Sequence, residues 1–214
     1  MKQTHFIRRV IQFLLGINIL ALGGAFSIVA GQGTTPVNVL PYVLSQIFST
    51  NIRFWMMLVM GIYLLIQGLL LKKFSWINIA QLIAGLLFGT FVDLYLLLIG
   101  SQAPFGTFGV LLYVVLSILC VALGITLYVD ANVLQMPTEG VLHALATRYP
   151  KRWPFYRGKI MADSVSVLLS VILSILFLRE IRGVGIGTLV SAFMIGPIVK
   201  VFQELIARLR RKIS

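Results

Sequence analysis

Charged residues are scarce in this chain, and their scarcity excludes most classes of soluble protein. Only 11% of the 214 residues are Asp, Glu, Lys or Arg, whereas 59% are hydrophobic. A soluble domain carries about 25% charged residues because its surface must face water. A chain of this length cannot bury so much apolar surface in one soluble core. The composition therefore excludes a cytosolic enzyme, a secreted disulfide-stabilised domain and a disordered segment, and it predicts a polytopic membrane protein.

Residues with reactive side chains are also rare. The single cysteine, Cys120, lies in an apolar run and has no second cysteine for an intramolecular disulfide. The two histidines, His5 and His143, are far apart and lack acidic neighbours at ligand spacing, which argues against a His-based metal centre. The sequence contains no phosphate-binding loop, zinc-protease motif or nucleophile elbow. We therefore expect no enzyme activity, no metal and no cofactor.

Long apolar stretches make up most of what is present. A helix that spans a bilayer needs about 20 mostly apolar residues, whereas strands of a membrane barrel are shorter and alternate in polarity. The sequence therefore predicts an all-α fold, a polytopic bundle of six transmembrane helices in a single membrane domain, residues 1–214. The predicted spans are Val10–Ala30, Phe54–Leu71, Ile77–Ile99, Val110–Val129, Ile160–Leu178 and Val184–Phe202.

Positive charge exceeds negative charge, with 18 Lys and Arg against 6 Asp and Glu. Such an excess in a soluble protein would indicate nucleic-acid binding, but most of these residues fall on one side of the predicted bundle. The positive-inside rule makes that side cytoplasmic, and six spans place both termini there. We expect a multi-pass protein that contacts the lipid bilayer and no nucleic acid. The residues on this side are Lys2, Arg8, Arg9, Lys72, Lys73, Arg148, Lys151, Arg152, Arg157, Lys159, Arg208, Arg210, Arg211 and Lys212; Arg53, Arg179 and Arg182 lie opposite.

The second half of the chain repeats the first. An offset of 101 residues aligns Ala21–Gly23 with Ala122–Gly124 and Pro36 with Pro137. Further along, the offset becomes 107 and aligns Gly89 with Gly196. The repeats cover about residues 10–100 and 110–206, and residues 203–214 form a basic amphipathic tail at the inner membrane surface. Since each repeat has three spans, the sequence predicts two inverted repeats, as in many secondary transporters.

A short segment that begins with proline follows the first helix of each repeat. Thr35 can cap a helix whose first residue is Pro36, and Gly33 and Thr34 precede it. The counterpart in the second repeat begins at Pro137. Each segment is too short to span the membrane, so it either dips into the bilayer as a half-helix or lies along its surface. A dipping half-helix would direct backbone N–H groups towards an anion or polar ligand.

Two glycine-containing stretches carry a family resemblance. Residues 31–40 (GQGTTPVNVL) and residues 185–197 (GIGTLVSAFMIGP), together with the six-helix plan, resemble the YczE/YyaS/YitT family of bacterial integral membrane proteins. The resemblance implies a bacterial cytoplasmic-membrane protein, is compatible with a transporter, and provides no catalytic residues. The second repeat has Asn132–Gln135 where the first has its glycine-threonine turn, so if the first turn binds a ligand, the two halves are not functionally equivalent.

Polar and small residues recur every four positions in the third and sixth predicted spans. Such a stripe can line a substrate path between repeats, and it can equally allow close helix packing. Ser166 and Ser170, which follow Asp163 on one face of the fifth span, have the same two interpretations. The stripes consist of Gln81, Gly85, Gly89 and Asp93 in the third span and Thr188, Ala192, Gly196 and Lys200 in the sixth.

Charged residues within the spans are expected to be paired or to face a cavity. Asp93 and Lys200 lie near opposite membrane faces, because each is about 24 Å along its own helix from the opposite boundary. We therefore expect Asp93 to meet Arg53, and Lys200 to meet Asp163 or Asp130.

These features favour a small-molecule transporter or exporter that works by alternating access and uses a substrate and a coupling ion not identified by the sequence. The alternative is a membrane accessory or regulatory protein that acts through the predicted cytoplasmic loop Arg148–Lys159 and the tail.

Overall fold

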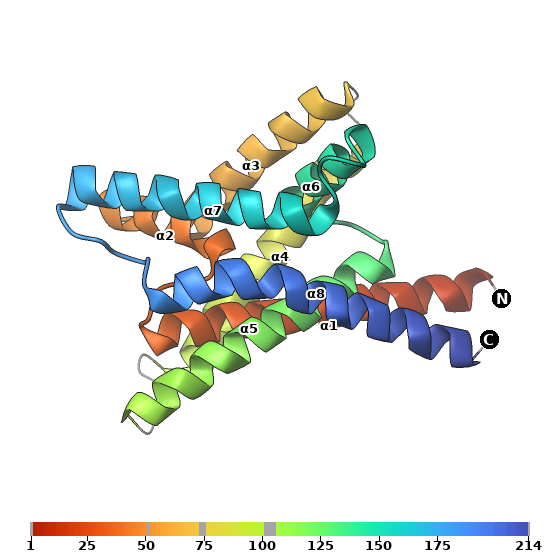
Figure 1. The fold of residues 1–214 in the computed structure, drawn as a ribbon, viewed down its shortest axis with the longest axis horizontal. Helices are drawn as coiled ribbons and strands as arrows, with labels where there is room; N and C mark the ends of the chain where they lie inside the picture. Colours follow the sequence, from red (N-terminus) through yellow and green to blue (C-terminus); the bar gives the residue numbers. More distant parts are fainter. Residues whose placement is uncertain (1, 51, 73–75, 101–105, 214) are drawn as a thin grey trace.

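The computed structural model describes residues 2–50, 52–72, 76–100 and 106–213, which form a bundle of helices (Figure 1). These described residues contain no strand. Six helices are long and apolar enough to cross a membrane, which confirms the predicted all-α bundle and its six spans. The helices are α1 (Lys2–Ala30), α2 (Pro36–Ile47), α3 (Ile52–Leu71), α4 (Trp76–Ile99), α5 (Gly106–Ala131), α6 (Pro137–Arg148), α7 (Phe155–Leu173) with the π-helical turn η1 (Ser174–Leu178), and α8 (Ile186–Ile213).

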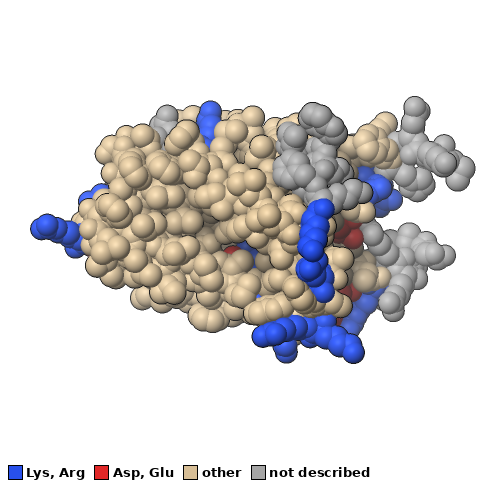
Figure 2. All heavy atoms as spheres, turned by 90° about the horizontal axis from the view of Figure 1, so that it is seen from above, with Lys and Arg blue, Asp and Glu red and all other residues tan. Residues whose placement is uncertain are grey.

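The surface of the bundle is that of a membrane protein. The N-terminus and the C-terminus lie at the same end of the molecule (Figure 1). Lys and Arg gather mostly towards that end, and the face seen in Figure 2 is otherwise formed almost entirely by other residues. Large apolar side chains are exposed on the long helices, among them Leu69 (79% exposed) and Leu97 (83% exposed). Since soluble proteins rarely expose wide apolar surfaces, the chain requires a lipid bilayer.

The antiparallel pair α1 and α5 forms the centre of the bundle. Arg9, near the start of α1, donates from Nε to the carbonyl of Ala131 at the end of α5 (2.7 Å). Towards the opposite ends of the two helices, the rings of Phe26 and Tyr113 are 4.9 Å apart. The backbones approach closely between these contacts, since a Cβ added at Gly124 would lie 2.6 Å from the Leu20 nitrogen. Small residues therefore set the spacing of the central pair, as in other membrane bundles.

The short helices α2 and α6 each have 12 residues and begin inside the bundle. After α1 ends at Ala30 the chain turns back, so that the backbone N–H of Thr35 donates to Ser27 Oγ (3.1 Å). Thr35 is the N-cap residue and Pro36 the first helical residue, as predicted, but the Thr35 side chain makes no capping bond. Met136, the N-cap residue of α6, is fully buried and makes none either. Both helices thus start in the interior without a side-chain cap.

The packing of α2 and α6 joins the two halves of the chain. α2 packs against α7 of the second half, and α6 packs against α3 of the first half. The remaining contacts follow the same order in each half, because α4 lies on α1 and α8 lies on α5. The larger apolar core lies between α1, α3, α4, α5 and α8, and a smaller one, around Val39, Val43 and Val167, lies between α2 and α7. Each half is therefore completed by the short helix of the other.

Candidate functional site

A small cavity lies at the centre of the molecule, where the first turns of α2 and α6 meet α1 and α5. About 10 Å³ of it is open to the centre of a water molecule, close to the minimum that holds one water. Both N-cap residues, Thr35 and Met136, line it together with Glu139. The other lining residues are Leu20, Gly24, Val37, Phe88, Val121 and Ile125. Two uncapped helix N-termini and one carboxyl group therefore lie around a single enclosed space.

Glu139 is the acidic residue at this cavity. It lies in the first turn of α6, is 1% exposed, and accepts a hydrogen bond from the Thr138 hydroxyl. A carboxylate near a helix N-terminus is stabilised by the helix dipole. The 101-residue offset pairs Glu139 with Asn38 of α2, which is also fully buried and whose two amide atoms have no partner among the described residues. The two halves thus present a carboxylate and an amide at equivalent positions.

An ion pair on α7 lies close to Glu139. Lys159 and Asp163 are one helical turn apart, both 3% exposed, and Nζ lies 2.8 Å from Asp163 Oδ1. Lys159 also interacts electrostatically with Glu139. Removing such charges from water costs several kcal/mol per ion unless close ion pairs and hydrogen bonds offset the cost. Each charged group is therefore stabilised in the interior by the others.

Helix α3 supplies the polar groups that close the site. The Tyr63 and Ser166 hydroxyls are 3.1 Å apart and hydrogen-bonded. Gln67 lies against the first turn of α6, since a Cβ at Gly140 would be 2.5 Å from Gln67 Oε1. We call the whole set the interior polar cluster; it comprises Tyr63, Gln67, Tyr128, Glu139, His143, Lys159, Asp163 and Ser166, drawn from α3, α5, α6 and α7.

His143 is the one histidine of the cluster. Its ring lies 4.9 Å from that of Phe155. Burial lowers the pKa of His143 from its usual value, and the nearby Glu139 carboxylate opposes part of this shift. At pH 7 the imidazole is therefore neutral. The side chain of His5 lies outside the described part of the chain.

The predicted stripe of α4 packs against α3. A Cβ at Gly85 would lie 2.2 Å from Met60 Sδ, and one at Gly89 would contact Met56. Gln81 is buried, and its Oε1 has no partner within the described residues. Asp93 forms an ion pair with Arg53, which confirms the predicted pairing.

The predicted stripe of α8 is divided between two environments. Thr188 is buried near the start of the helix, whereas Gly196 packs against Ile160 of α7. Lys200 is exposed, lies 4.0 Å from Glu204 and approaches the Tyr156 ring. The predicted contact of Lys200 with Asp163 is wrong, because Asp163 is enclosed and paired within its own helix.

The serines of α7 and the predicted cytoplasmic loop before it are arranged differently from the predicted substrate path and exposed loop. Ser166 belongs to the interior polar cluster, but the Ser170 hydroxyl donates to the Ser166 carbonyl of its own helix (2.7 Å). Lys159, which the sequence assigns to a cytoplasmic loop, is buried. Hydropathy placed the start of this span at Ile160, whereas α7 begins at Phe155.

The two glycine-containing stretches meet at the far end of the bundle from the termini. The Thr188 hydroxyl donates to the Thr34 carbonyl (2.8 Å), and the Thr34 N–H donates to the Gly183 carbonyl (2.8 Å). Gly33 has φ +96°, and a Cβ there would lie 2.2 Å from Thr188 Oγ1. A polar hollow of ≈ 210 Å³ adjoins this junction, lined by Thr34, Tyr42 and glycines from both stretches. Gly33 and Thr34 thus join the start of α2 to the start of α8.

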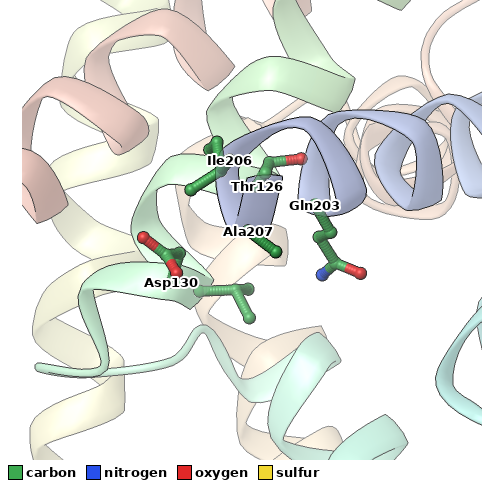
Figure 3. Close-up of a pocket in the computed structure, with 6 residues that line it drawn as sticks. Thr126, Asp130, Gln203, Ile206 and Ala207 are labelled. Carbon is green, nitrogen blue, oxygen red and sulfur yellow. The ribbon is translucent and has the colours of Figure 1, made fainter. Parts of the chain in front are cut away.

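A larger hollow opens between α5 and α8 on the side of the termini. It has a volume of ≈ 490 Å³, and Figure 3 shows its lining by Thr126 and Asp130 of α5 and by Gln203, Ile206 and Ala207 of α8, with the Asp130 carboxylate directed away from Gln203. Asp130 accepts a hydrogen bond from Gln12 Nε2 (2.7 Å). Thr126 also lines this hollow, next in sequence to Ile125 of the central cavity.

A family model covers most of the chain, since residues 7–204 match the "Family of unknown function (DUF6198)". The chain belongs to the DUF6198 family. It is 25% identical over 195 residues to the "Uncharacterized protein YyaS" of Bacillus subtilis (strain 168), covering 91% of this chain and 92% of that protein. This match confirms the resemblance to the YyaS family. No solved structure is significantly similar.

Within the DUF6198 match lie all the residues of the interior polar cluster, and sequence reasoning missed most of them as site residues. Tyr63, Gln67 and Lys159 appear in the sequence as isolated polar positions in or near apolar runs. Two features of the sequence could have identified Glu139 and Lys159 as site residues. Glu139 is the acidic residue that aligns with Asn38 at the 101-residue offset, and Lys159 precedes Asp163 by one helical turn.

Proposed function

We propose that this DUF6198 protein is a small-molecule transporter of the bacterial cytoplasmic membrane, working by alternating access between two inverted three-span repeats. The observation that carries the proposal is the central cavity, where the first turns of α2 and α6 meet between α1 and α5. Half-helices whose N-termini meet near the bilayer midplane are a recurrent way to build a substrate site in secondary transporters.

The contacts between helices support the inverted repeat. A Cβ at Gly23 would lie 2.8 Å from the nitrogen of Val121, and one at Gly124 would lie 2.6 Å from the nitrogen of Leu20. The 101-residue offset converts the first contact into the second, because it pairs Gly23 with Gly124 and Leu20 with Val121. A contact that maps onto itself across an antiparallel helix pair is what a two-fold axis in the membrane plane produces.

Three hollows support a substrate path through the protein: the one at the junction of the two glycine-containing stretches (the outer hollow), the central cavity, and the one beside the termini. Thr34 lines the outer hollow and its neighbour Thr35 the central cavity, whereas Ile125 lines the central cavity and Thr126 the hollow beside the termini. The central cavity is almost closed, and both flanking hollows are open. In the proposed transport cycle this arrangement would be the occluded state, and a rocking of one repeat against the other would open either side.

The charge distribution supports the orientation with both termini in the cytoplasm. Lys and Arg gather mostly at the end with the termini (Figure 2), and the positive-inside rule assigns that end to the cytoplasm. α8 continues through the predicted tail as far as Ile213, and Ser214 lies outside the described residues.

Cysteine accessibility tests the proposal. In a Cys120→Ser background, Val37→Cys introduces a thiol at the central cavity, and a membrane-impermeant thiol reagent is applied to right-side-out and inverted vesicles. We expect labelling from both sides, because alternating access exposes the cavity to each in turn. Labelling from neither side, or from one side alone, would contradict a transporter and favour the accessory role.

Matched variants show that the assay reports what is intended. Ser49→Cys and Lys151→Cys follow the ends of α2 and α6 and are exposed, so each must label from a single side, and the two sides must differ. Labelling of both from the same side would overturn the inverted topology. Leu97→Cys, at an 83% exposed apolar position, controls for reagent that enters the lipid.

A further inference from the structure

The interior polar cluster has an unbalanced charge. Glu139 and Asp163 contribute two carboxylates, Lys159 contributes one ammonium group, and all three are at most 3% exposed. Tyrosine hydroxyls are neutral near pH 7, and burial keeps His143 neutral as well. Among the described residues of the cluster, carboxylates therefore outnumber ammonium groups by one, and an uncompensated charge inside a membrane protein is strongly unfavourable.

We infer that the interior polar cluster binds one exchangeable monovalent cation, a proton or an alkali ion, at Glu139. The inference rests on the proposed function, in which this cation is the coupling ion. It deepens that function by assigning the ion to named residues.

Two buried oxygen atoms of the interior polar cluster lack a hydrogen-bond partner among the described residues. They are Gln67 Oε1, which lies beside the first turn of α6, and Asp163 Oδ2, whose residue interacts electrostatically with Glu139. Gln67 and Asp163 are 7% and 3% exposed, and the fully buried Tyr128 hydroxyl interacts with the Glu139 carboxylate itself. Buried polar atoms are rarely left unpaired, and oxygen atoms are the ligands of hard cations. The same atoms can accept a hydrogen bond from a protonated carboxyl group.

The titratable groups that interact with Glu139 come from α3, α5, α6 and α7. Tyr63 lies on α3, Tyr128 on α5, His143 on α6, and Lys159 and Asp163 on α7. Lys159 is already paired with Asp163 Oδ1, so it neutralises one carboxylate and not both. Since His143 is neutral, Glu139 is the carboxylate that requires the additional cation.

The position of Glu139 explains why the cation can exchange and why each chain has one cation site. Glu139 lines the central cavity, so movements that open this cavity also open a route for the cation. The equivalent residue of the first half is Asn38, whose amide carries no charge. The repeat therefore provides one cation position in each chain, although the helices around it occur twice.

Labelling with dicyclohexylcarbodiimide tests the inference on the purified full-length protein. This hydrophobic reagent modifies protonated carboxyl groups, and mass spectrometry locates the label on the peptide that contains Glu139. We expect Glu139 of the folded protein to be labelled in the absence of sodium. If the cation is a proton, NaCl has no effect; if it is an alkali ion, NaCl protects Glu139 at constant pH and an equal concentration of choline chloride does not.

The controls separate a negative result from a failed assay. Glu139→Gln, which keeps the side-chain shape, must lose the label, whereas Asp93→Asn, at the Arg53 ion pair, must retain it. Protein unfolded in dodecyl sulfate verifies that the reagent can modify the Glu139 peptide. If Glu139 in the folded protein stays unlabelled at every pH without sodium, the cluster is a static structural network and the inference is wrong. That result would leave the Val37→Cys test unaffected, because the reagent reports cation occupancy and not transport.

Discussion

At the scale of single residues, Lys159 is a charged side chain buried in the interior of the bundle. Its ammonium group is enclosed, pairs with Asp163 at 2.8 Å, and interacts electrostatically with Glu139 of the neighbouring helix α6. A buried ion pair adds little net stability compared with apolar residues of the same size, but breaking it leaves a charge without a partner. The stability of the protein therefore depends on the pair being intact.

Lys159→Met tests this dependence. We expect a loss of about 3–5 kcal/mol in the free energy of unfolding, because Asp163 loses its counter-charge while remaining buried. The double replacement Lys159→Met with Asp163→Leu should recover most of the loss. Lys200→Met, which breaks an exposed pair with Glu204, should change stability by less than about 1 kcal/mol. Unfolding in detergent measures all three, and equal effects of the two lysine substitutions would refute the role given to Lys159.

His143 should make stability depend on pH. Burial lowers its pKa in the folded protein below the usual value of 6.5, so at acidic pH the unfolded chain binds the proton more readily. The contribution of His143 to stability is therefore complete above pH 6.5, falls as the pH drops below this value, and becomes constant below the lowered pKa. His143→Leu should reduce the slope of melting temperature against pH in this window, and an unchanged slope would contradict the assignment.

The sequence predicted a residue's partner correctly where the depth of both residues along their helices was enough to identify the pair. Asp93 was expected at Arg53 because both positions follow from the rise of their helices, and the pair forms. Lys200 could not be placed in the same way, because its direction around α8 is not fixed by its depth in the membrane. Glu139 and Lys159 become a site only when α6 packs on α7 and on α3, and the contact of α6 with α3 joins residues that are far apart in the sequence.

At the scale of helices, small residues determine how closely the elements approach. The stripes of α4 and α8 were expected to line a path or to pack, and their glycines contact α3 and α7 respectively. A repeat of four residues predicts both arrangements, so the sequence could not distinguish them. The central pair α1 and α5, which packs more tightly still, uses Gly16, Gly23 and Gly124 at positions that hydropathy alone does not mark.

Alanine substitutions test the symmetry of the central pair. Gly23→Ala and Gly124→Ala each place a Cβ less than 3 Å from the backbone of the partner helix, and overpacking of this kind costs about 1–3 kcal/mol. Since the two contacts are equivalent under the 101-residue offset, we expect similar losses of thermal stability. Gly61→Ala in α3, where no atom lies within 4 Å of the added Cβ, should be neutral or raise stability by up to about 1 kcal/mol. A loss confined to one of the two central glycines would contradict equivalent packing.

At the scale of the whole molecule, the halves are interlocked rather than side by side. The number of spans, the repeated order of the elements and the proline-led helices were all predictable, because each is written as a local pattern of hydropathy or turn residues. The exchange of α2 and α6 between halves was not predictable, because it depends on which apolar surfaces meet. Hydropathy assigns a segment to the membrane but does not identify its neighbour.

Cleavage between the halves tests the interlocking. A protease recognition sequence inserted at residues 101–105, between α4 and α5, allows the purified protein to be cut after it has folded. We expect both fragments to elute together in size-exclusion chromatography, since α1 remains packed on α5, α2 on α7, and α3 on α6. The uncut protein with the same insertion is the control. Separation of the fragments in mild detergent would show that the contacts between halves are weaker than proposed.

The exchange of short helices also affects synthesis at the ribosome. When α2 and α3 enter the membrane, the helices that will cover them have not been made. Tyr63, for example, cannot form its hydrogen bond until Ser166, 103 residues later, has been synthesised. The first three spans must therefore remain in the bilayer with Tyr63 and Gln67 uncovered, and contacts between distant parts of a chain form late in folding. Nascent chains that stop before α7 should consequently be preferred substrates for membrane chaperones and quality-control proteases.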